Sequence, residues 1–142
     1  MNLKAMNVEK QAQYLIEHDG LSNTLGMEFL STPEPDTLMA RMAVDDRTKQ
    51  PFGFLSGGAS LALAENTAGV GSMALCPDRV PLGVNVQGNH VQAMPYGGTV
   101  IAHARIMHQG GTLHVWQVDI KNEAGELIST VQVTNYLLTP KK

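Results

Sequence analysis

One acidic residue stands alone in a long apolar part of this sequence. Glu65 is the only charged residue between Lys49 and Asp78. The segment around it, residues 57–75, is small and apolar on nearly every face of a helix. A helix without a polar face is normally buried, and a carboxylate inside it is costly unless it is paired, hydrogen-bonded or used. We therefore expect Glu65 to be buried and to act as a general base or as a nucleophile.

A loop and a pair of glycines come directly before this helix. The loop begins at Gln50, Ser56 stands at the expected N-cap, and Gly57 and Gly58 stand where the helix should begin. Their N–H groups have no intrahelical partner, so with the helix dipole they are suited to polarise a carbonyl and hold an oxyanion. Glycine also lets a substrate approach the backbone closely. An acid near an open helix N-terminus suggests acyl chemistry, while close packing of loop and helix is a second reason for the glycines.

The spacing of the two features predicts an oligomer. Glu65 lies eight residues beyond Gly57, which is about 12 Å along a helix axis. One carbonyl carbon cannot lie within reach of both groups on the same helix. We therefore expect Glu65 of one subunit to face Gly57 of another, with two sites in a two-fold dimer. The alternative for Glu65 is a buried side chain hydrogen-bonded to Thr or Asn at a subunit contact.

Composition excludes several classes of function. Charged residues make up 16% of the 142, the formal net charge is -3, and no basic run occurs before Lys141-Lys142. Aromatic residues make up only 5%. A nucleic-acid-binding surface needs clustered Lys and Arg and often aromatic stacking platforms, so we expect no nucleic-acid partner.

The cysteine and histidine content and the amino-terminal segment set further limits. A single cysteine, Cys76, excludes an internal disulfide and is compatible with a reducing compartment. No spacing among the five histidines resembles a zinc site, so we expect neither a metal nor another cofactor. Residues 1–10 mix charges too early for a signal peptide, and Asn66, Thr67 and Glu65 argue against a membrane helix at 57–75. These features predict a cytoplasmic protein that does not bind a membrane.

The hydrophobic periodicity predicts an α+β fold in one domain, residues 1–142. A helix is expected within residues 1–20, over 8–18 with Asn7 as its N-cap, and the central helix over 57–75. Alternating apolar residues predict strands at 26–30, 38–44, 82–86, 100–106, 116–120 and 127–138, followed by a tail at 138–142. Four strands after one apolar helix suggest an antiparallel sheet wrapped around that helix.

Several short runs in the sequence form a recognisable set. The first three are Gln50-Pro51-Phe52-Gly53, Gly57-Gly58-Ala59-Ser60 and Leu63-Ala64-Glu65. The later ones are Asn89-His90-Val91, Gly110-Gly111 and Val115-Trp116-Gln117. Over residues 20–138 this pattern resembles the hotdog-fold acyl-CoA thioesterases. It is closest to the branch with a glutamate on the central helix, which includes 1,4-dihydroxy-2-naphthoyl-CoA, 4-hydroxybenzoyl-CoA and phenylacetic-acid-degradation thioesterases.

The resemblance implies both an assembly and a set of site residues. Two subunits would join their sheets edge to edge and share the active site, and two such dimers would form a homotetramer. Glu65, Gly57 and Gln50 would be catalytic, with Gln50 donating to the thioester carbonyl or contacting the leaving group. The residues expected to contact the substrate are Ser56, Gly58, Gly69, Asn89, His90 and Gln92.

The chain departs from the family pattern at two positions. Ser56 stands where the branch commonly has His, which removes an imidazole that could bond the thioester oxygen. Gly69 stands where Ser or Thr often follows the carboxylate by one turn, which removes a hydroxyl that could hold the attacking water.

The sequence thus predicts an enzyme that hydrolyses an acyl-CoA thioester, with an aryl acyl group, to the free acid and CoA. A general-base route and an anhydride route through Glu65 both stay open, as does acyl carrier protein in place of CoA. A hotdog protein that binds acyl-CoA without catalysis is the first alternative. A hotdog dehydratase or hydratase is the second, and the missing His at position 56 weighs against it.

Overall fold

The structure, a computed structural model, describes residues 8–141. Six antiparallel strands form one sheet in the order β1-β2-β4-β5-β6-β3. The strands are β1 (Glu28–Ser31), β2 (Thr37–Ala43), β3 (Val80–His90), β4 (Thr99–Gln109), β5 (Leu113–Asn122) and β6 (Leu127–Leu138). The helices are α1 (Val8–His18), α2 (Leu21–Leu25) and α3 (Gly57–Leu75). Asn7, the expected N-cap of the first helix, lies outside the described residues.

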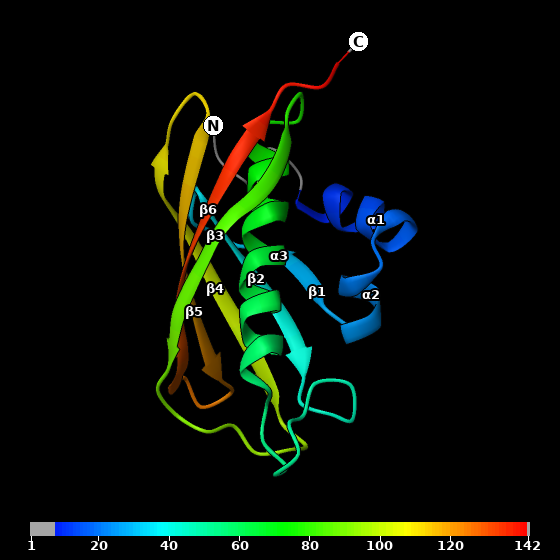
Figure 1. Cartoon of the computed structure of the whole chain (residues 1–142), viewed down its shortest axis with the longest axis vertical. Coiled ribbons are helices and arrows are strands. Elements are labelled where there is room, and N and C mark those ends of the chain that lie inside the picture. The colour runs from blue at the N-terminus through cyan, green and yellow to red at the C-terminus, as the bar shows by residue number, and fades with distance from the viewer. Residues whose placement is uncertain (1–7, 142) are drawn as a thin grey trace.

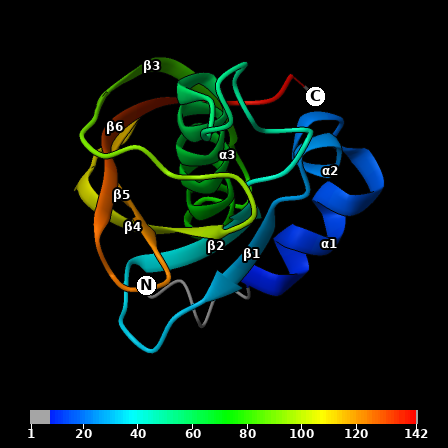
Figure 2. The ribbon, with the colours of Figure 1, turned by 90° about the horizontal axis from the view of Figure 1, so that it is seen from below.

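The sheet curves around α3, and α1 and α2 lie beside β1 at its far edge (Figures 1 and 2). The expected α+β architecture, an antiparallel sheet around a central helix, is confirmed. The predicted bounds of α3 agree with the structure. Alternation along the strands points one set of side chains at the helix, including the fully buried Trp116, Val118 and Ile120 of β5.

The central helix is less enclosed than its sequence suggests. Its buried face packs against the sheet, but a stripe at helical spacing stays half-buried: Leu61, Ala62, Glu65, Asn66, Gly69 and Met73. The expectation that Glu65 is buried is therefore wrong for the single chain. The reason is that β3 ends the sheet on one side of α3 and α1 covers only part of the opening.

β3 is one of the two edge strands of the described sheet, and α1 packs against the other, β1. β3 pairs only with β6 among the described strands, and a register shift between Gly83 and Asn85 makes a bulge in it. Leu82 and Val84 were expected to alternate in a strand of the sheet, yet these two residues are 45% and 59% exposed. An edge strand with exposed apolar side chains is a template for pairing with another chain.

Two differences concern the amino-terminal elements. Val8 is fully buried and Ala12 and Leu15 pack on the core, but Ile16, expected on the same side, is 61% exposed. The five-residue helix α2 was not predicted; it ends at Gly26, which has a φ of 72° and accepts the left-handed conformation that stops a helix. Within residues 8–141, no helix is long and apolar enough to cross a membrane.

Candidate active site

The loop before α3 delivers Ser56 to the N-cap position, where it has extended backbone angles. Its side chain forms no capping hydrogen bond, so the expected side-chain cap is absent. The backbone holds the turn instead, because Ser56 N donates to Thr48 O at 2.8 Å and Ser60 N donates to Ser56 O at 3.1 Å. The N–H groups of the first turn are left without an intrahelical acceptor, as at any helix start.

His90 lies directly against Gly57. A Cβ atom at position 57 would lie 2.7 Å from His90 Nε2, so any side chain there would displace the imidazole. The other ring nitrogen, Nδ1, is 2.7 Å from the Oγ of Ser129. Ser129 is fully buried and stands opposite His90 in the β3–β6 register, which explains how two residues 39 apart in sequence meet. Ser129 was not predicted as a site residue, since a serine inside an apolar strand carries no pattern of its own.

A cavity of about 340 Å³ opens beside these residues, and we call it the N-terminal cleft. Its lining includes Gln50, Gly57, Ser60, His90, Gln92 and Ser129. Four of the predicted site residues therefore meet here. Ser56, Gly58 and Asn89, which were also predicted, are not among the lining residues.

Within residues 8–141, the Gln50 side chain is hydrogen-bonded only through its amide oxygen. Its Oε1 accepts a hydrogen bond from Phe52 N, and Gln50 N donates to Phe54 O at 2.7 Å. The carbonyl end of the amide is therefore engaged within the loop. The Nε2 group remains able to donate to a ligand in the N-terminal cleft.

Glu65 lies in a different cavity, of about 540 Å³, between α1, α3 and the start of β3. We call it the α1–α3 cavity. Among its lining residues are Tyr14, Leu15, Glu65, Gly69, Met73 and Val80. The two groups that the sequence assigns to catalysis, Gly57 and Glu65, thus line separate cavities of one chain.

The Glu65 carboxylate lies against the backbone of Gly83 in β3. A Cβ atom at Gly83 would lie 2.9 Å from Glu65 Cδ, so a side chain there would push the carboxylate away. Within residues 8–141 the carboxylate accepts no hydrogen bond. Thr67 Oγ1 donates instead to Leu63 O at 2.6 Å, and Asn66 Nδ2 donates to Ser22 Oγ at 2.8 Å. The structural alternative for Glu65, a bond to Thr or Asn, is therefore not met inside the chain.

A buried polar cluster lies near the other end of α3. Ser72 Oγ accepts from Trp116 Nε1 at 2.9 Å and from Asn135 Nδ2 at 3.1 Å. The Ser72 hydroxyl hydrogen is then left to donate to His114 Nδ1, 2.8 Å away. Because Nδ1 accepts this bond, the proton of the neutral ring is assigned to Nε2, which lies 3.7 Å from Cys76 Sγ. Burial, with smaller contributions from His108 and Arg79, lowers the pKa of His114.

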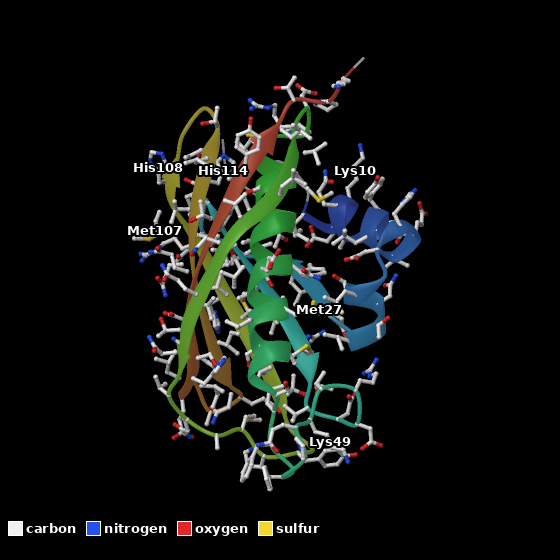
Figure 3. All side chains as sticks on the ribbon, viewed as in Figure 1. Lys10, Met27, Lys49, Met107, His108 and His114 are labelled. Atoms are coloured by element: carbon white, nitrogen blue, oxygen red, sulfur yellow. The ribbon has the colours of Figure 1, made fainter. Side chains whose placement is uncertain are left out.

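This cluster is remote from the N-terminal cleft. Figure 3 labels Lys49 in the loop at which α3 begins and His114 at the opposite end of the molecule. His103 and His108 are exposed on β4, as expected for surface histidines. Burial also lowers the pKa of His103, with a smaller contribution from Lys121. In the described part of the chain, no group of three or more His, Cys, Asp or Glu side chains could hold a metal ion.

Comparison with known proteins gives a consistent set of similarities. The model of the thioesterase superfamily matches residues 52–129. A 1,4-dihydroxy-2-naphthoyl-CoA hydrolase of Listeria monocytogenes is 34% identical over 81% of this chain and 93% of its own length. The Escherichia coli protein of the same name is 41% identical over 72% of this chain and 76% of its own.

Solved structures agree with these relatives. A thioesterase variant from Pseudomonas aeruginosa superposes with a TM-score of 0.86 and 29% identity, covering 94% of this chain and 95% of the other. A thioesterase from Haemophilus influenzae gives a TM-score of 0.83 and 32% identity, covering 94% of this chain and 91% of its own. The resemblance drawn from the sequence motifs is confirmed.

Proposed function

The chain belongs to the thioesterase superfamily, and from that premise we propose that it hydrolyses an aryl-CoA thioester at a site shared by two subunits. Thioester hydrolysis is the activity of the family, and the fold is the hotdog fold of its solved members. One observation carries the shared site: Gly57, Gln50 and His90 line the N-terminal cleft, while Glu65 lines the α1–α3 cavity. Neither cavity of a single chain holds both an oxyanion donor and the carboxylate.

The N-terminal cleft would bind the thioester carbonyl. The Gly57 N–H at the start of α3 points a donor and a helix dipole at the oxygen, and Gln50 Nε2 adds a second donor. His90 Nε2 lies beside Gly57 and can add a third when it carries a proton. These donors stabilise the negative charge that develops on the oxygen as the carbonyl carbon becomes tetrahedral.

Glu65 of the partner subunit would complete the site. Its carboxylate either takes a proton from the attacking water or attacks the carbonyl carbon itself to give a mixed anhydride. In the first route the proton taken from water passes to the departing sulfur as the carbon–sulfur bond breaks, and CoA leaves as its thiol. In the second route CoA leaves as a thiolate, and water then hydrolyses the anhydride, which releases the acid, restores the carboxylate and supplies the proton for the thiol. A carboxylate that accepts no hydrogen bond within residues 8–141 and is only half-buried is free to do either.

The free edge of β3 supports the assembly that this site needs. Pairing β3 with β3 of a second copy would cover the exposed Leu82 and Val84 and satisfy the unpaired backbone groups. A two-fold dimer of this kind has two equivalent sites. Light scattering that gives a fully active monomer of 15.3 kDa would rule the shared site out.

The proposed preference for an aryl acyl group is supported by the relatives named 1,4-dihydroxy-2-naphthoyl-CoA hydrolase. Steady-state kinetics with acetyl-CoA, benzoyl-CoA and naphthoyl-CoA will test both the reaction and this preference. Acetyl-CoA turned over as well as the aromatic esters would contradict the preference and leave the hydrolase assignment in place.

The decisive variant is Glu65→Gln, which keeps the shape of the side chain and removes its charge. We expect kcat to fall by roughly a hundredfold or more with little change in KM, because the group acts only in the reacting state. Glu17→Gln, an exposed acid on α1, is the matched control and should leave the kinetics unchanged. If Glu65→Gln keeps more than about a tenth of kcat, less than ~1.4 kcal/mol can be assigned to the carboxylate, which is too little for its proposed role.

A non-catalytic acyl-CoA-binding protein is the second candidate. One observation favours it: Gly69 stands one turn after Glu65 and offers no hydroxyl to hold a water molecule. Calorimetric binding of benzoyl-CoA by a wild-type protein that does not hydrolyse it would decide for this candidate.

A further inference from the structure

Asn135 is a buried side chain with an unused hydrogen-bond acceptor. It lies on β6, is 1% exposed and lines the α1–α3 cavity together with Glu65. Its Nδ2 donates to Ser72 Oγ at 3.1 Å, which anchors one end of the amide. Within residues 8–141 the other end, Oδ1, accepts no hydrogen bond. Because a buried acceptor without a partner is costly, an acceptor of this kind in a cavity indicates a bound water molecule or ligand.

The amide of Asn135 is held in one orientation. Ser72 Oγ, which accepts its Nδ2 hydrogen, also bonds Trp116 Nε1 at 2.9 Å and His114 Nδ1 at 2.8 Å. All four side chains are buried. A buried network whose members bond one another in this way is rigid. The Oδ1 atom of Asn135 therefore keeps a fixed direction.

The register of the sheet places Asn135 close to the carboxylate of Glu65. Asn135 stands directly opposite Gly83 in the β3–β6 pairing, and directly opposed residues have Cβ positions about 4.5–5.5 Å apart. The Cβ position of Gly83 lies 2.9 Å from Glu65 Cδ. Glu65 Cδ is therefore within about 8 Å of Asn135 Cβ. Since Gly83 has no side chain, the two polar groups and one water molecule between them can fill this span.

The chemistry of the attacking water requires an acceptor at such a place. A water molecule that attacks a carbonyl carbon must keep a lone pair free for that carbon, so both of its hydrogens are best bound by acceptors. The Glu65 carboxylate is one acceptor and takes its hydrogen as the general base. A second acceptor must orient the other hydrogen, because a donor there would occupy the lone pair. Gly69, one turn after Glu65, has no hydroxyl for this task.

We propose that Asn135 Oδ1 and the Glu65 carboxylate of the same chain hold the attacking water between them. The inference rests on the proposed function and concerns its general-base route. One O–H bond of the water breaks, its proton passes to Glu65, and the oxygen bonds to the carbonyl carbon bound at the N-terminal cleft of the partner subunit. The other hydrogen stays on the oxygen and is bound by Asn135, which neither gains nor loses a proton.

Asn135→Leu removes the acceptor and keeps the branched shape of the side chain. We expect it to lower kcat for benzoyl-CoA by roughly tenfold or more with KM within about twofold, because the water acts in the reaction and not in substrate binding. Thr134→Leu is the matched control, since Thr134 is the next residue of β6 and alternation turns its side chain to the outer face of the sheet. This control should leave kcat unchanged. A smaller loss in Asn135→Leu, or an equal loss in both variants, would overturn the inference.

A hydroxyl introduced at position 69 separates water binding from a structural role of Asn135. Gly69 lines the same cavity, and nothing lies within 4 Å of a Cβ added there. A serine at this position could accept the hydrogen that Asn135 no longer binds. We expect Gly69→Ser to raise kcat of the Asn135→Leu variant by roughly fivefold, the worth of one hydrogen bond. Gly69→Ala, which adds the methyl group alone, should not raise it. Rescue by both substitutions, or by neither, would contradict a water-holding role.

The outcomes also separate this inference from the proposed function. Urea denaturation shows whether Asn135→Leu is folded, and if it is not, Asn135→Ala replaces it in the same comparison with the two substitutions at Gly69. An active wild type whose Asn135 variants keep its kcat refutes the water site and leaves the hydrolase standing. A wild type that hydrolyses none of acetyl-CoA, benzoyl-CoA and naphthoyl-CoA refutes the proposed function, and the water site with it.

Discussion

The imidazole of His90 lies against the backbone of Gly57, at the point where the helix dipole and the free amides of α3 are directed. The family pattern that the sequence resembles has His where this chain has Ser56, so the loop itself offers no imidazole next to the glycine pair. An imidazole is nonetheless present there, supplied by the end of β3 and held by Ser129 of β6. The loop thus lacks an imidazole at position 56, while the end of β3 places one beside the first glycine of α3.

We predict that His90→Ala lowers kcat/KM by roughly ten- to a hundredfold, as loss of one donor to a developing oxyanion does. Ser129→Ala should have a smaller effect in the same direction, because it only frees the ring to rotate. The double variant should be no worse than His90→Ala, since Ser129 would act through His90. His103→Ala, on the outer face of β4, is the control. If kcat/KM of His90→Ala lies within twofold of the wild-type value, the imidazole has no role in the site.

The Ser56 side chain makes no capping hydrogen bond, which changes what its removal should do. We predict that Ser56→Ala alters the free energy of unfolding by less than about 0.5 kcal/mol, because the usual cost of losing a cap is the loss of that bond. Thr48→Ala is the contrasting variant. The Thr48 hydroxyl is buried, donates to Ala43 O at 2.8 Å and accepts from Asp45 N at 3.0 Å.

Removing the Thr48 hydroxyl leaves buried backbone groups unpaired and should cost about 1–3 kcal/mol. Urea denaturation of both variants, followed by circular dichroism, gives the two values. Equal destabilisation would mean that Ser56 caps α3 after all.

Within α3, two glycines two residues apart face opposite surroundings. We predict that Gly71→Ala destabilises the fold by about 1–3 kcal/mol, because its methyl group would collide with Trp116 and Leu38 in a close-packed core. Gly69→Ala should stabilise the fold by up to about 1 kcal/mol, the difference in helix propensity in open space. Urea denaturation of the two variants measures the contrast. If both variants change the free energy of unfolding in the same direction, Gly69 and Gly71 do not lie on an open and a close-packed face of α3.

The strength of the periodic signal decided how well each element was predicted. The long apolar helix at residues 57–75 and the alternating strands were placed correctly, because their patterns continue over many residues. The helix α2 was missed since five residues cannot show a period. Exposure of Leu82 and Val84 could not be foreseen, because the same alternation is found in central and edge strands.

The candidate site was only partly predictable for a related reason. Motif residues near α3, such as Gln50 and Gly57, were identified from their spacing, and both line the N-terminal cleft. Ser129 and Gly83 act on His90 and Glu65 from β6 and β3, and only the pairing of distant strands brings them there. Gly58 and Asn89 were assigned from their neighbours in sequence, but neither lines the cleft.

At the scale of the whole molecule, the buried His114 makes stability depend on pH. Burial lowers its pKa below the ordinary 6.5, so below about pH 6.5 the unfolded chain binds the proton more readily than the folded one. The stabilising Ser72–His114 hydrogen bond needs the neutral ring. We therefore predict that the contribution of His114 to the free energy of unfolding is constant above about pH 6.5. This contribution should decrease as the pH drops below 6.5.

Urea denaturation between pH 7.5 and 5 checks the prediction, with His114→Gln expected to show a flatter dependence than wild type. His103→Gln is the comparison, because the pKa of His103 is also lowered. This variant should change the slope of unfolding free energy against pH less than His114→Gln does, because His103 is exposed. An identical slope in wild type and His114→Gln would show that the buried ring does not govern acid sensitivity.

The separation of Gly57 and Glu65 into two cavities of one chain has a genetic consequence. A shared site means that a chain with a defective carboxylate and a chain with a defective cleft can complement each other. Equal amounts of Glu65→Gln and His90→Ala subunits, unfolded and refolded together, would form mixed dimers in which one site carries both defects and the other carries none. Random pairing would restore about a quarter of the wild-type sites from two impaired parents. In a cell, two damaged alleles of this gene could together supply the activity that neither provides alone.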